Sequence, residues 1–350
     1  PAEIQAQLDD VAGAEHAQNQ QMALNITGQF NEFLGMRLDQ TLGSAMGGGM
    51  AGLGGQQYAD AATTATDGSA SARGGSHGLN RGPSGVSVWL RGFGQWVNVD
   101  ADPNASGYDQ DTSGAAGGID YAVANNATVG VAGSWSKTES EFDTFGDSSE
   151  IDSWAAGAYG SVGLGRFYVD GLASYTSHDV SAIRTVTVPN VAPPPATSTF
   201  LASSAYDATA WTVQAEVGML FGLGRVNLQP SAGLSYSDLT TDAFRESADV
   251  PYDVYALIVE EASAESFAST LALRASGEWK MGKTRVMPEI RVGWRHEFEN
   301  DPHSFSAAFS EDPLTQFTII SSELQQDSAV VRAGATFGVT RNIEVFVNLN

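Results

Sequence analysis

The stretch Trp211–Leu239, WTVQAEVGMLFGLGRVNLQPSAGLSYSDL, contains the pattern that the larger part of this 350-residue chain repeats. From Trp211 to Phe221 every second residue is apolar, and Thr212, Gln214 and Glu216 stand between them. Alternation of this length predicts a β-strand with one apolar face and one polar face. A tight turn at Leu223-Gly224 leads into a second segment of the same kind.

About eleven segments of the chain alternate in this way. Most of them are longer than the five or six residues usual in globular sheets, and they are long enough for tilted strands that cross a bilayer. The predicted strands are 86–98, 112–124, 127–141, 151–163, 166–179, 208–222, 225–239, 265–280, 284–299, 326–339 and 342–350.

Short turns and long connections alternate between these segments. The short turns are Asn125-Asn126, Leu164-Gly165, Leu223-Gly224, Met281-Gly282-Lys283 and Thr340-Arg341, and the long polar connections are 99–111, 142–150, 180–207, 240–264 and 300–325. All short turns therefore lie at one end of the strands, as in outer-membrane barrels with periplasmic turns and extracellular loops. The predicted fold is all-β, an antiparallel transmembrane up-and-down β-barrel.

The polar face of the predicted strands carries many charges, which decides the direction in which it points. A membrane barrel turns its apolar face to lipid and its polar face to the lumen, and aromatic residues mark the lipid interfaces. Trp96, Trp211, Trp279 and Phe298 stand near the ends of the apolar face. We therefore expect seven charged residues to face the lumen: Arg91, Glu216, Arg274, Arg291, Arg295, Glu297 and Arg332.

One helical pattern precedes the strands, in Gln20–Leu42, QQMALNITGQFNEFLGMRLDQTL. Its apolar residues recur in steps of three and four, which predicts a stripe along a helix roughly 30 to 35 Å long. The stripe alone fits either a helix inside the barrel or one packed outside a soluble β-domain. Because a barrel of about twelve strands has room for one helix, we place it in the lumen. The candidate pore-helix residues are Ile26, Phe30, Glu32, Phe33, Arg37 and Asp39, and bulkier groups at Gly28 or Ile26 are expected to affect secretion or pore block.

Composition divides the chain into three parts and excludes several classes of partner and activity. We expect a helical segment at 1–43, a Gly/Ala/Ser-rich linker at 44–85 that cannot form a core, and the barrel at 86–350. The formal charge of −24 argues against nucleic acid as a partner. With no cysteine, five scattered histidines and no G-x-S-x-G motif, we predict no metal, no cofactor and no enzymatic activity for this region. The chain has no apolar run of 18 residues, so strands and not helices would cross the membrane.

Several motifs resemble a known family. They are Met36-Arg37-Leu38 at the end of the helix, Val88–Gly94 in the first strand, Leu228–Tyr236, and Phe317–Ile320 followed by Gln326–Gly334. In order and spacing they resemble the C-terminal translocator domain of autotransporters, the type V secretion proteins. The resemblance implies a twelve-stranded barrel in the outer membrane of a Gram-negative bacterium, with a lumen helix joined to a passenger at the cell surface. It also implies outer-membrane lipid, lipopolysaccharide and the barrel-assembly machinery as partners, and a monomer.

Two features depart from the family pattern. The chain stops at Asn350, partway along the eleventh predicted strand, so we expect the twelfth, closing strand to be missing through cropping, since an open edge cannot stay in lipid. Some relatives cut themselves at an Asn-Asn pair in the helix, whereas Asn25 and Asn31 lie apart here, so self-cleavage is not carried over.

Three functions fit these observations. The first is a translocator that anchors and exports an N-terminal passenger. The second is an outer-membrane porin or diffusion channel with a periplasmic helix, and the third is a barrel enzyme. The identity of the passenger is not encoded in this region.

Overall fold

The computed structural model describes most of the chain after Ala12. The described residues are 13–45, 68–69, 86–99, 107–143, 146–189, 197–223, 226–277, 279–281, 284–299, 302–321, 325–338 and 344–349. The predicted linker 44–85 lies almost wholly outside the described residues, as do residues 1–12.

The predicted helix is present as α2, Glu15–Ala45. At 31 residues it is about 46 Å long, longer than the predicted stripe. The apolar stripe is buried from Met22 to Leu38. The helix starts five residues earlier than predicted because Glu15 to Asn19 are buried by segments distant in sequence, which a local pattern does not show. Among the described residues, no helix has the length and hydropathy needed to cross a membrane.

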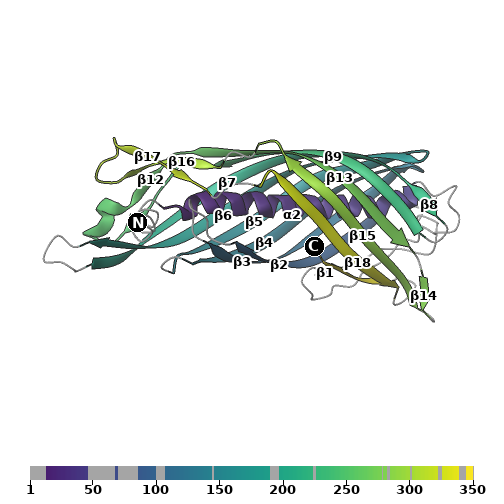
Figure 1. Ribbon diagram of the computed structural model, residues 1–350, viewed down its shortest axis with the longest axis horizontal. Helices are drawn as coiled ribbons and strands as arrows, with labels where there is room; N and C mark the ends of the chain where they lie inside the picture. Colours follow the sequence, from purple (N-terminus) through teal and green to yellow (C-terminus); the bar gives the residue numbers. More distant parts are fainter. Residues whose placement is uncertain are drawn as a thin grey trace.

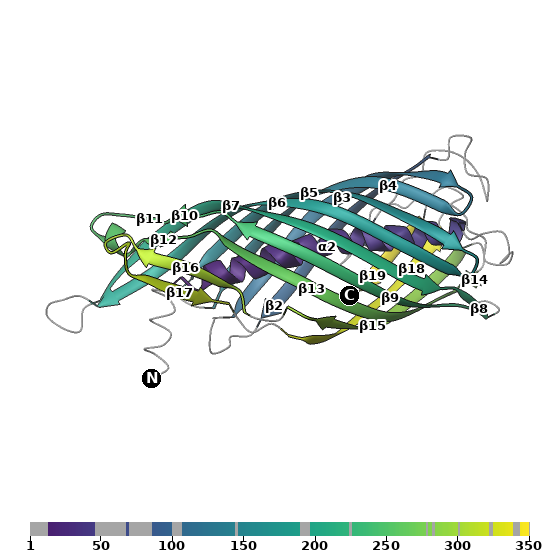
Figure 2. The same cartoon turned by 90° about the horizontal axis from the view of Figure 1, so that it is seen from above.

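Eleven long strands form one antiparallel sheet in which each strand pairs with the next along the chain. They are β2 Val86–Val99, β3 Tyr108–Ala124, β4 Ala127–Phe142, β5 Ser148–Leu164, β6 Phe167–Pro189, β7 Thr197–Met219, β9 Val226–Thr241, β13 Ala262–Gly277, β15 Thr284–Glu297, β18 Asp327–Gly338 and β19 Glu344–Leu349. Short strands β8 Phe221–Leu223 and β14 Trp279–Met281 extend two hairpins, and β1 Gly68–Ser69 pairs with β19. Figures 1 and 2 show the sheet curled around α2. The predicted fold class is confirmed.

The two faces of the curled sheet differ as alternation requires. Outward residues such as Val131, Val213 and Leu271 are exposed and apolar, whereas charged residues such as Arg91, Glu216 and Arg332 are buried inside. The outward apolar band ends in aromatic residues: Trp135 pairs with Trp154, and the Tyr175 ring lies 5.5 Å from that of Trp154 and 4.7 Å from that of Trp211. We call Trp135, Trp154, Tyr175 and Trp211 the outer girdle.

The long connections hold more structure than the sequence indicated. The predicted connection 180–207 is mostly strand, because β6 continues to Pro189 and β7 starts at Thr197. Beyond the outer girdle much of the apolar surface of these strands turns inward, although Ile183 and Leu201 are exposed and Arg184 is buried. Val180, Val186 and Phe200 point inward and are buried, whereas Asp179 and Asp207 are exposed. Such a change is expected where water replaces lipid outside a membrane barrel.

The connections 240–264 and 300–325, predicted as loops, form a second sheet. Its strands are β10 Phe244–Arg245, β12 Leu257–Val259, β16 Ser304–Phe309 and β17 Gln316–Ile320, in the order β10-β12-β16-β17. β11 Ser247–Ala248 pairs with β7, and η1 Tyr252–Tyr255 follows it. We call these two segments, with β6 from Asp179 and β7 up to Asp207, the outer cap. It lies where α2 begins (Figure 1).

Two hydrophobic clusters contain the large apolar side chains of α2, and a third, smaller cluster contains Ala23 and Leu24. The first lies in the outer cap, where Ala17, Met22 and Ile26 pack with residues including Phe244, Leu257 and Phe305. The second lies deeper in the barrel, where Phe30, Phe33 and Leu34 pack with residues including Trp89, Tyr159 and Leu172. Burial of this kind stabilises a packed helix by about 25 cal/mol for each Å² of apolar surface removed from water. Each half of α2 therefore has its own core.

Candidate functional site

The candidate site is the contact between α2 and the barrel wall, which begins with close packing against β5. A Cβ added to Gly157 would lie 2.9 Å from Leu34 Cδ1 and 3.2 Å from Phe30 Cε1. A side chain at this position would push the helix away from the wall. Gly157 thus allows Phe30 and Leu34 to sit directly on the strand.

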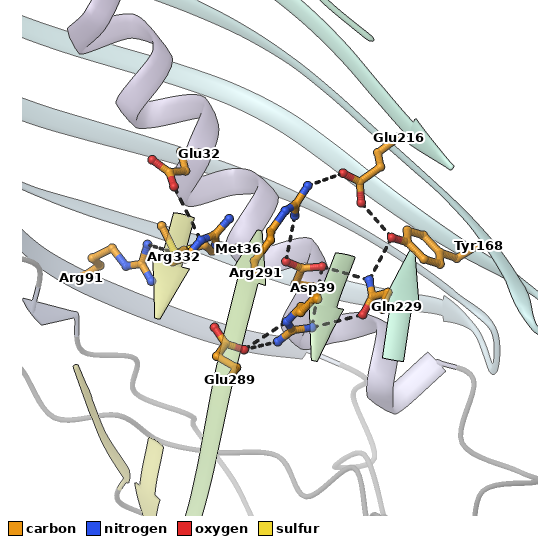
Figure 3. Close-up of polar contacts among 11 residues, drawn as sticks. Glu32, Met36, Asp39, Arg91, Tyr168, Glu216, Gln229, Glu289, Arg291 and Arg332 are labelled. Carbon is orange, nitrogen blue, oxygen red and sulfur yellow. Dashed lines mark hydrogen bonds and ion pairs between the residues drawn. The ribbon is translucent and has the colours of Figure 1, made fainter. Parts of the chain in front are cut away.

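The inner end of α2 is held by a network around Asp39 (Figure 3). Asp39 lies 3.5 Å from Arg291 Nη1 and 3.8 Å from Arg274 Nη1, and it accepts a hydrogen bond from Gln229 Nε2 at 3.2 Å. Arg291 also donates to Glu216 Oε2 at 2.6 Å, and Arg274 pairs with Glu289. The two guanidinium groups that pair with Asp39 come from β13 and β15. We call this network the inner cluster.

Two residues before Asp39, Arg37 enters a second buried pair. Arg37 Nε donates to Asp120 Oδ2 at 2.8 Å. Asp120 also accepts a hydrogen bond from the Tyr159 hydroxyl, which itself accepts one from Trp89 Nε1 at 2.7 Å. Removing one partner from a buried pair costs about 3–5 kcal/mol, because the other charge stays buried. This network therefore opposes movement of Arg37 along the lumen.

The middle of α2 makes mainly neutral contacts with the wall. Thr27 Oγ1 lies 3.0 Å from His178 Nε2, and the other nitrogen of that ring lies 2.8 Å from Ser153 Oγ. Ser174 Oγ donates to Asn31 Oδ1 at 2.6 Å. These bonds satisfy buried polar groups on both sides of the contact.

Two charged residues of the wall reach the middle of the helix (Figure 3). The Arg91 guanidinium lies over the Phe33 ring, 4.9 Å from its centroid, and its Nη1 lies 3.3 Å from Met36 Sδ. Arg332 Nε lies 3.7 Å from Glu32 Oε1.

The outer end of α2 meets four buried ionisable groups, which we call the outer cluster: Glu15, His16, Arg184 and Glu246. Arg184 donates through Nη2 to Glu246 Oε2 at 2.5 Å, and its Nε lies 3.3 Å from Glu15 Oε1. His16 Nε2 lies 2.9 Å from Glu246 Oε1. Burial raises the pKa of Glu15, and this effect outweighs the opposite influence of the His16 and Arg184 charges.

The structure places the candidate pore-helix residues against the wall. Ile26, Phe30 and Phe33 are buried in the two cores, and the charged residues Glu32, Arg37 and Asp39 each meet a partner. Five of the seven predicted lumen residues contact α2 or the inner cluster: Arg91, Glu216, Arg274, Arg291 and Arg332. Their part in transport stays a prediction.

Arg295 and Glu297 are placed differently. Both lie on β15, and Arg295 Nη2 donates to Glu297 Oε2 at 2.8 Å and to Ser266 Oγ at 3.2 Å. These contacts are within the barrel wall, so the structure does not bring the pair together with α2.

The structure shows no close packing at Gly28 that supports the expectation for this residue. Gly28 is exposed, and an added Cβ there meets no atom of the described residues within 4 Å. It lies on the face of α2 that turns away from the packed wall, so a larger side chain has room. Ile26, by contrast, is only 4% exposed.

Several site residues were missed from the sequence. Asp120 stands between the outward residues Ile119 and Tyr121, so alternation alone points it into the lumen. Alternation along their strands likewise points Tyr159, Tyr168 and Gln229 into the lumen. The outer cluster has no such signal, because Arg184 and Glu246 come from two segments predicted as loops.

Residues 88–350 match the family described as Autotransporter beta-domain. The chain belongs to this family. It is therefore an outer-membrane translocator of a Gram-negative bacterium, as the sequence predicted.

Two curated relatives and one solved structure are similar to this translocator. It is 23% identical over 255 residues to an extracellular serine protease of Serratia marcescens, covering 73% of this chain and 23% of that protein. It is 23% identical over 242 residues to outer membrane protein A of Rickettsia conorii, covering 65% of this chain and 12% of that protein. The chain thus spans less than a quarter of the length of these relatives. The translocator domain of autotransporter NalP from Neisseria meningitidis has the same fold, with a TM-score of 0.51, 13% identity, and coverage of 77% and 87%.

Proposed function

We propose that α2 runs through the lumen and connects the passenger to the barrel. Residues 1–43 form the passenger end and pore helix, 44–85 the linker back to the barrel, and 86–350 the translocator. The supporting observation is the direction of α2. Its first residues, Glu15 and His16, are buried in the outer cap, while Asp39 lies near the starts of β6 and β9, beside the tight turns.

Any enzymatic activity of the whole protein belongs to the passenger in this proposal. One relative is named an extracellular serine protease, but this chain covers only 23% of it. The passenger's activity therefore does not follow from that similarity.

The same proposal includes the remaining partners. The exposed apolar band below the outer girdle would contact outer-membrane lipid and lipopolysaccharide, and insertion would use the barrel-assembly machinery. Because α2 fills the lumen from within the same chain, one copy suffices, and we expect a monomer.

Site-directed labelling tests the direction of threading, since the chain has no native cysteine. Intact cells carrying Ala2→Cys would be treated with a membrane-impermeant maleimide, and we expect labelling. Two matched variants calibrate the two sides: Leu314→Cys, 93% exposed in the outer cap, should label, and Asn125→Cys in a tight turn should not. An unlabelled Ala2→Cys beside a labelled Leu314→Cys would refute outward threading and favour the channel function.

A further inference from the structure

The outer cluster joins three separate parts of the molecule through one set of charges. Glu15 and His16 open α2, Arg184 lies on β6, and Glu246 lies between β10 and β11. Glu246 Oε2 accepts hydrogen bonds from Arg184 Nη2 and from the backbone N–H of Leu257, the latter at 2.9 Å. The cluster thus fixes the start of α2 to both sheets of the outer cap.

Because the outer cluster consists of buried charges, its charge compensation depends on the position of α2 along the lumen, which we call the depth of the helix. The side chains of all four residues are at most 5% exposed, so each charge depends on the others for compensation. Sliding α2 by one turn, about 5.4 Å, would bring the uncharged Asn19 and Gln20 to Arg184 and Glu246. Glu15, His16 and Glu246 also place ligand atoms within 4.8 Å of one another, but the Arg184 cation already pairs with the two carboxylates and disfavours a metal ion.

The cluster lies outside the membrane band and far from the inner cluster. Arg184 is nine residues beyond Tyr175 of the outer girdle, about 30 Å along the strand. Glu15 and Arg37 are separated by about 33 Å of helix, and Glu32 is the one charged residue between His16 and Arg37. Along this nearly uncharged stretch, the depth of the helix is distinguished by packing and by neutral hydrogen bonds and not by ion pairs.

We propose that Arg184 and Glu246 are positioning residues that set the point at which the exported chain stops. This inference rests on the proposed outward threading of α2. Export proceeds until Glu15 and His16 reach the outer cap, where the four charges compensate one another and the outer core closes over Ala17 and Met22. The outer cluster then fixes the depth of the helix from outside, as the inner cluster does from within.

Disulfide cross-linking measures this depth in the full-length protein in cells. Asn31 contacts Ser174 on β6, so Asn31→Cys with Ser174→Cys reports the native depth. Gly35→Cys with Ser174→Cys reports a helix one turn further out. The ratio of the two yields is the readout, because looser packing alone lowers both yields without favouring the displaced position.

Two sets of variants alter the outer cluster, one in the barrel and one in the helix. Arg184→Gln and Glu246→Gln change the barrel, and Glu15→Gln with His16→Gln changes the helix. We expect the native yield to fall several-fold relative to the displaced yield in each case, and Arg184→Lys to restore part of it. Lys137→Gln is the matched control, because it removes an exposed cation 2.8 Å from Glu150 and should leave the ratio unchanged. Phe305→Ala loosens the outer core without removing charge and should also preserve the ratio.

An unchanged ratio in the Glu15→Gln, His16→Gln chain would overturn the proposal, even if the barrel variants fail to assemble. A shift of the ratio by Phe305→Ala as large as that by Arg184→Gln would also overturn it, since cap packing alone would then set the depth. Labelling of Ala2→Cys in the parent is scored separately. Failure there refutes outward threading, whereas a labelled parent with an unchanged ratio refutes only the role of the outer cluster.

Discussion

Gly157 and Gly28 show how two glycines of the same site differ. Gly157 on β5 touches Leu34 and Phe30, whereas Gly28 on α2 faces open space. A sequence pattern presents both as small residues in a helix or strand. Only the packing of α2 against one side of the barrel distinguishes the glycine that must stay small from the one that need not.

We expect Gly157→Leu to displace α2 and Gly28→Leu to be tolerated. Leucine at 157 would overlap Leu34 and Phe30, and overpacking of this kind typically costs about 1–3 kcal/mol. The displaced helix should block the lumen less completely, so ion conductance of the purified barrel in planar bilayers should rise. Gly28→Leu should match the parent, and replacing glycine in a helix favours the helix by up to about 1 kcal/mol. Equal conductance of the Gly157→Leu barrel and its parent would show that α2 does not pack on β5 as described.

At the scale of elements, the membrane strands could be predicted and the outer cap could not. Alternation located all eleven long strands, because lipid outside and charges inside impose one rule on each of them. That rule fails beyond the outer girdle. On β6, Val180 and Val186 point inward and Asp179 outward, the reverse of the pattern below, so this part was taken for a loop.

The same reasoning explains which parts of the candidate site could be predicted. Charges of the inner cluster lie on membrane strands, where the alternation of side chains between the two faces is enough to place Glu216, Arg274 and Arg291 in the lumen. Glu246 instead lies between two-residue strands, whose pairing depends on contacts with β12 and β7. Nothing local in the sequence marks such strands, and tertiary packing around α2 determines them.

The outer cap should lose stability in acid through Glu246. Burial raises the pKa of Glu246, but the hydrogen bond from His16 and the charge of Arg184 lower it to about 2. Since this lies below the value of about 4.3 in an unfolded chain, ionised Glu246 stabilises the cap above pH ~4, and the contribution is lost as the pH falls towards 2. Glu15, with its raised pKa, acts in the opposite direction, so the two effects must be separated.

Comparison with Glu246→Gln separates them. In a chain carrying Ala17→Cys, a buried position, the urea concentration that exposes the thiol to 4,4′-dithiodipyridine measures cap stability. The parent should exceed the Glu246→Gln variant at neutral pH, and the difference should shrink as the pH approaches 2. A difference that grows on acidification would contradict the assigned partners of Glu246.

At the scale of the whole molecule, α2 is a core element of both the barrel lumen and the outer cap. Its inner half packs with Trp89 and Leu172 of the wall, and its outer half with Phe244, Leu257 and Phe305 of the cap. Neither core is complete without the helix, although the antiparallel hydrogen bonds of the sheet do not involve it. Removing α2 should therefore affect closure and delivery more than barrel assembly.

Deletion of residues 20–42 should give an assembled barrel that conducts ions more readily and no longer delivers Ala2→Cys to the surface label. Conductance should rise because the deleted stretch carries Phe30, Phe33 and Leu34, which fill the lumen. Delivery should fail because the chain loses the charges that dock in the inner cluster. Deletion of 46–67 removes almost as many residues from the predicted linker and serves as the control, with both readouts expected near the parent. Normal labelling together with raised conductance would mean that α2 closes the pore without being needed for delivery, and unchanged conductance would mean that it does not fill the lumen in the membrane.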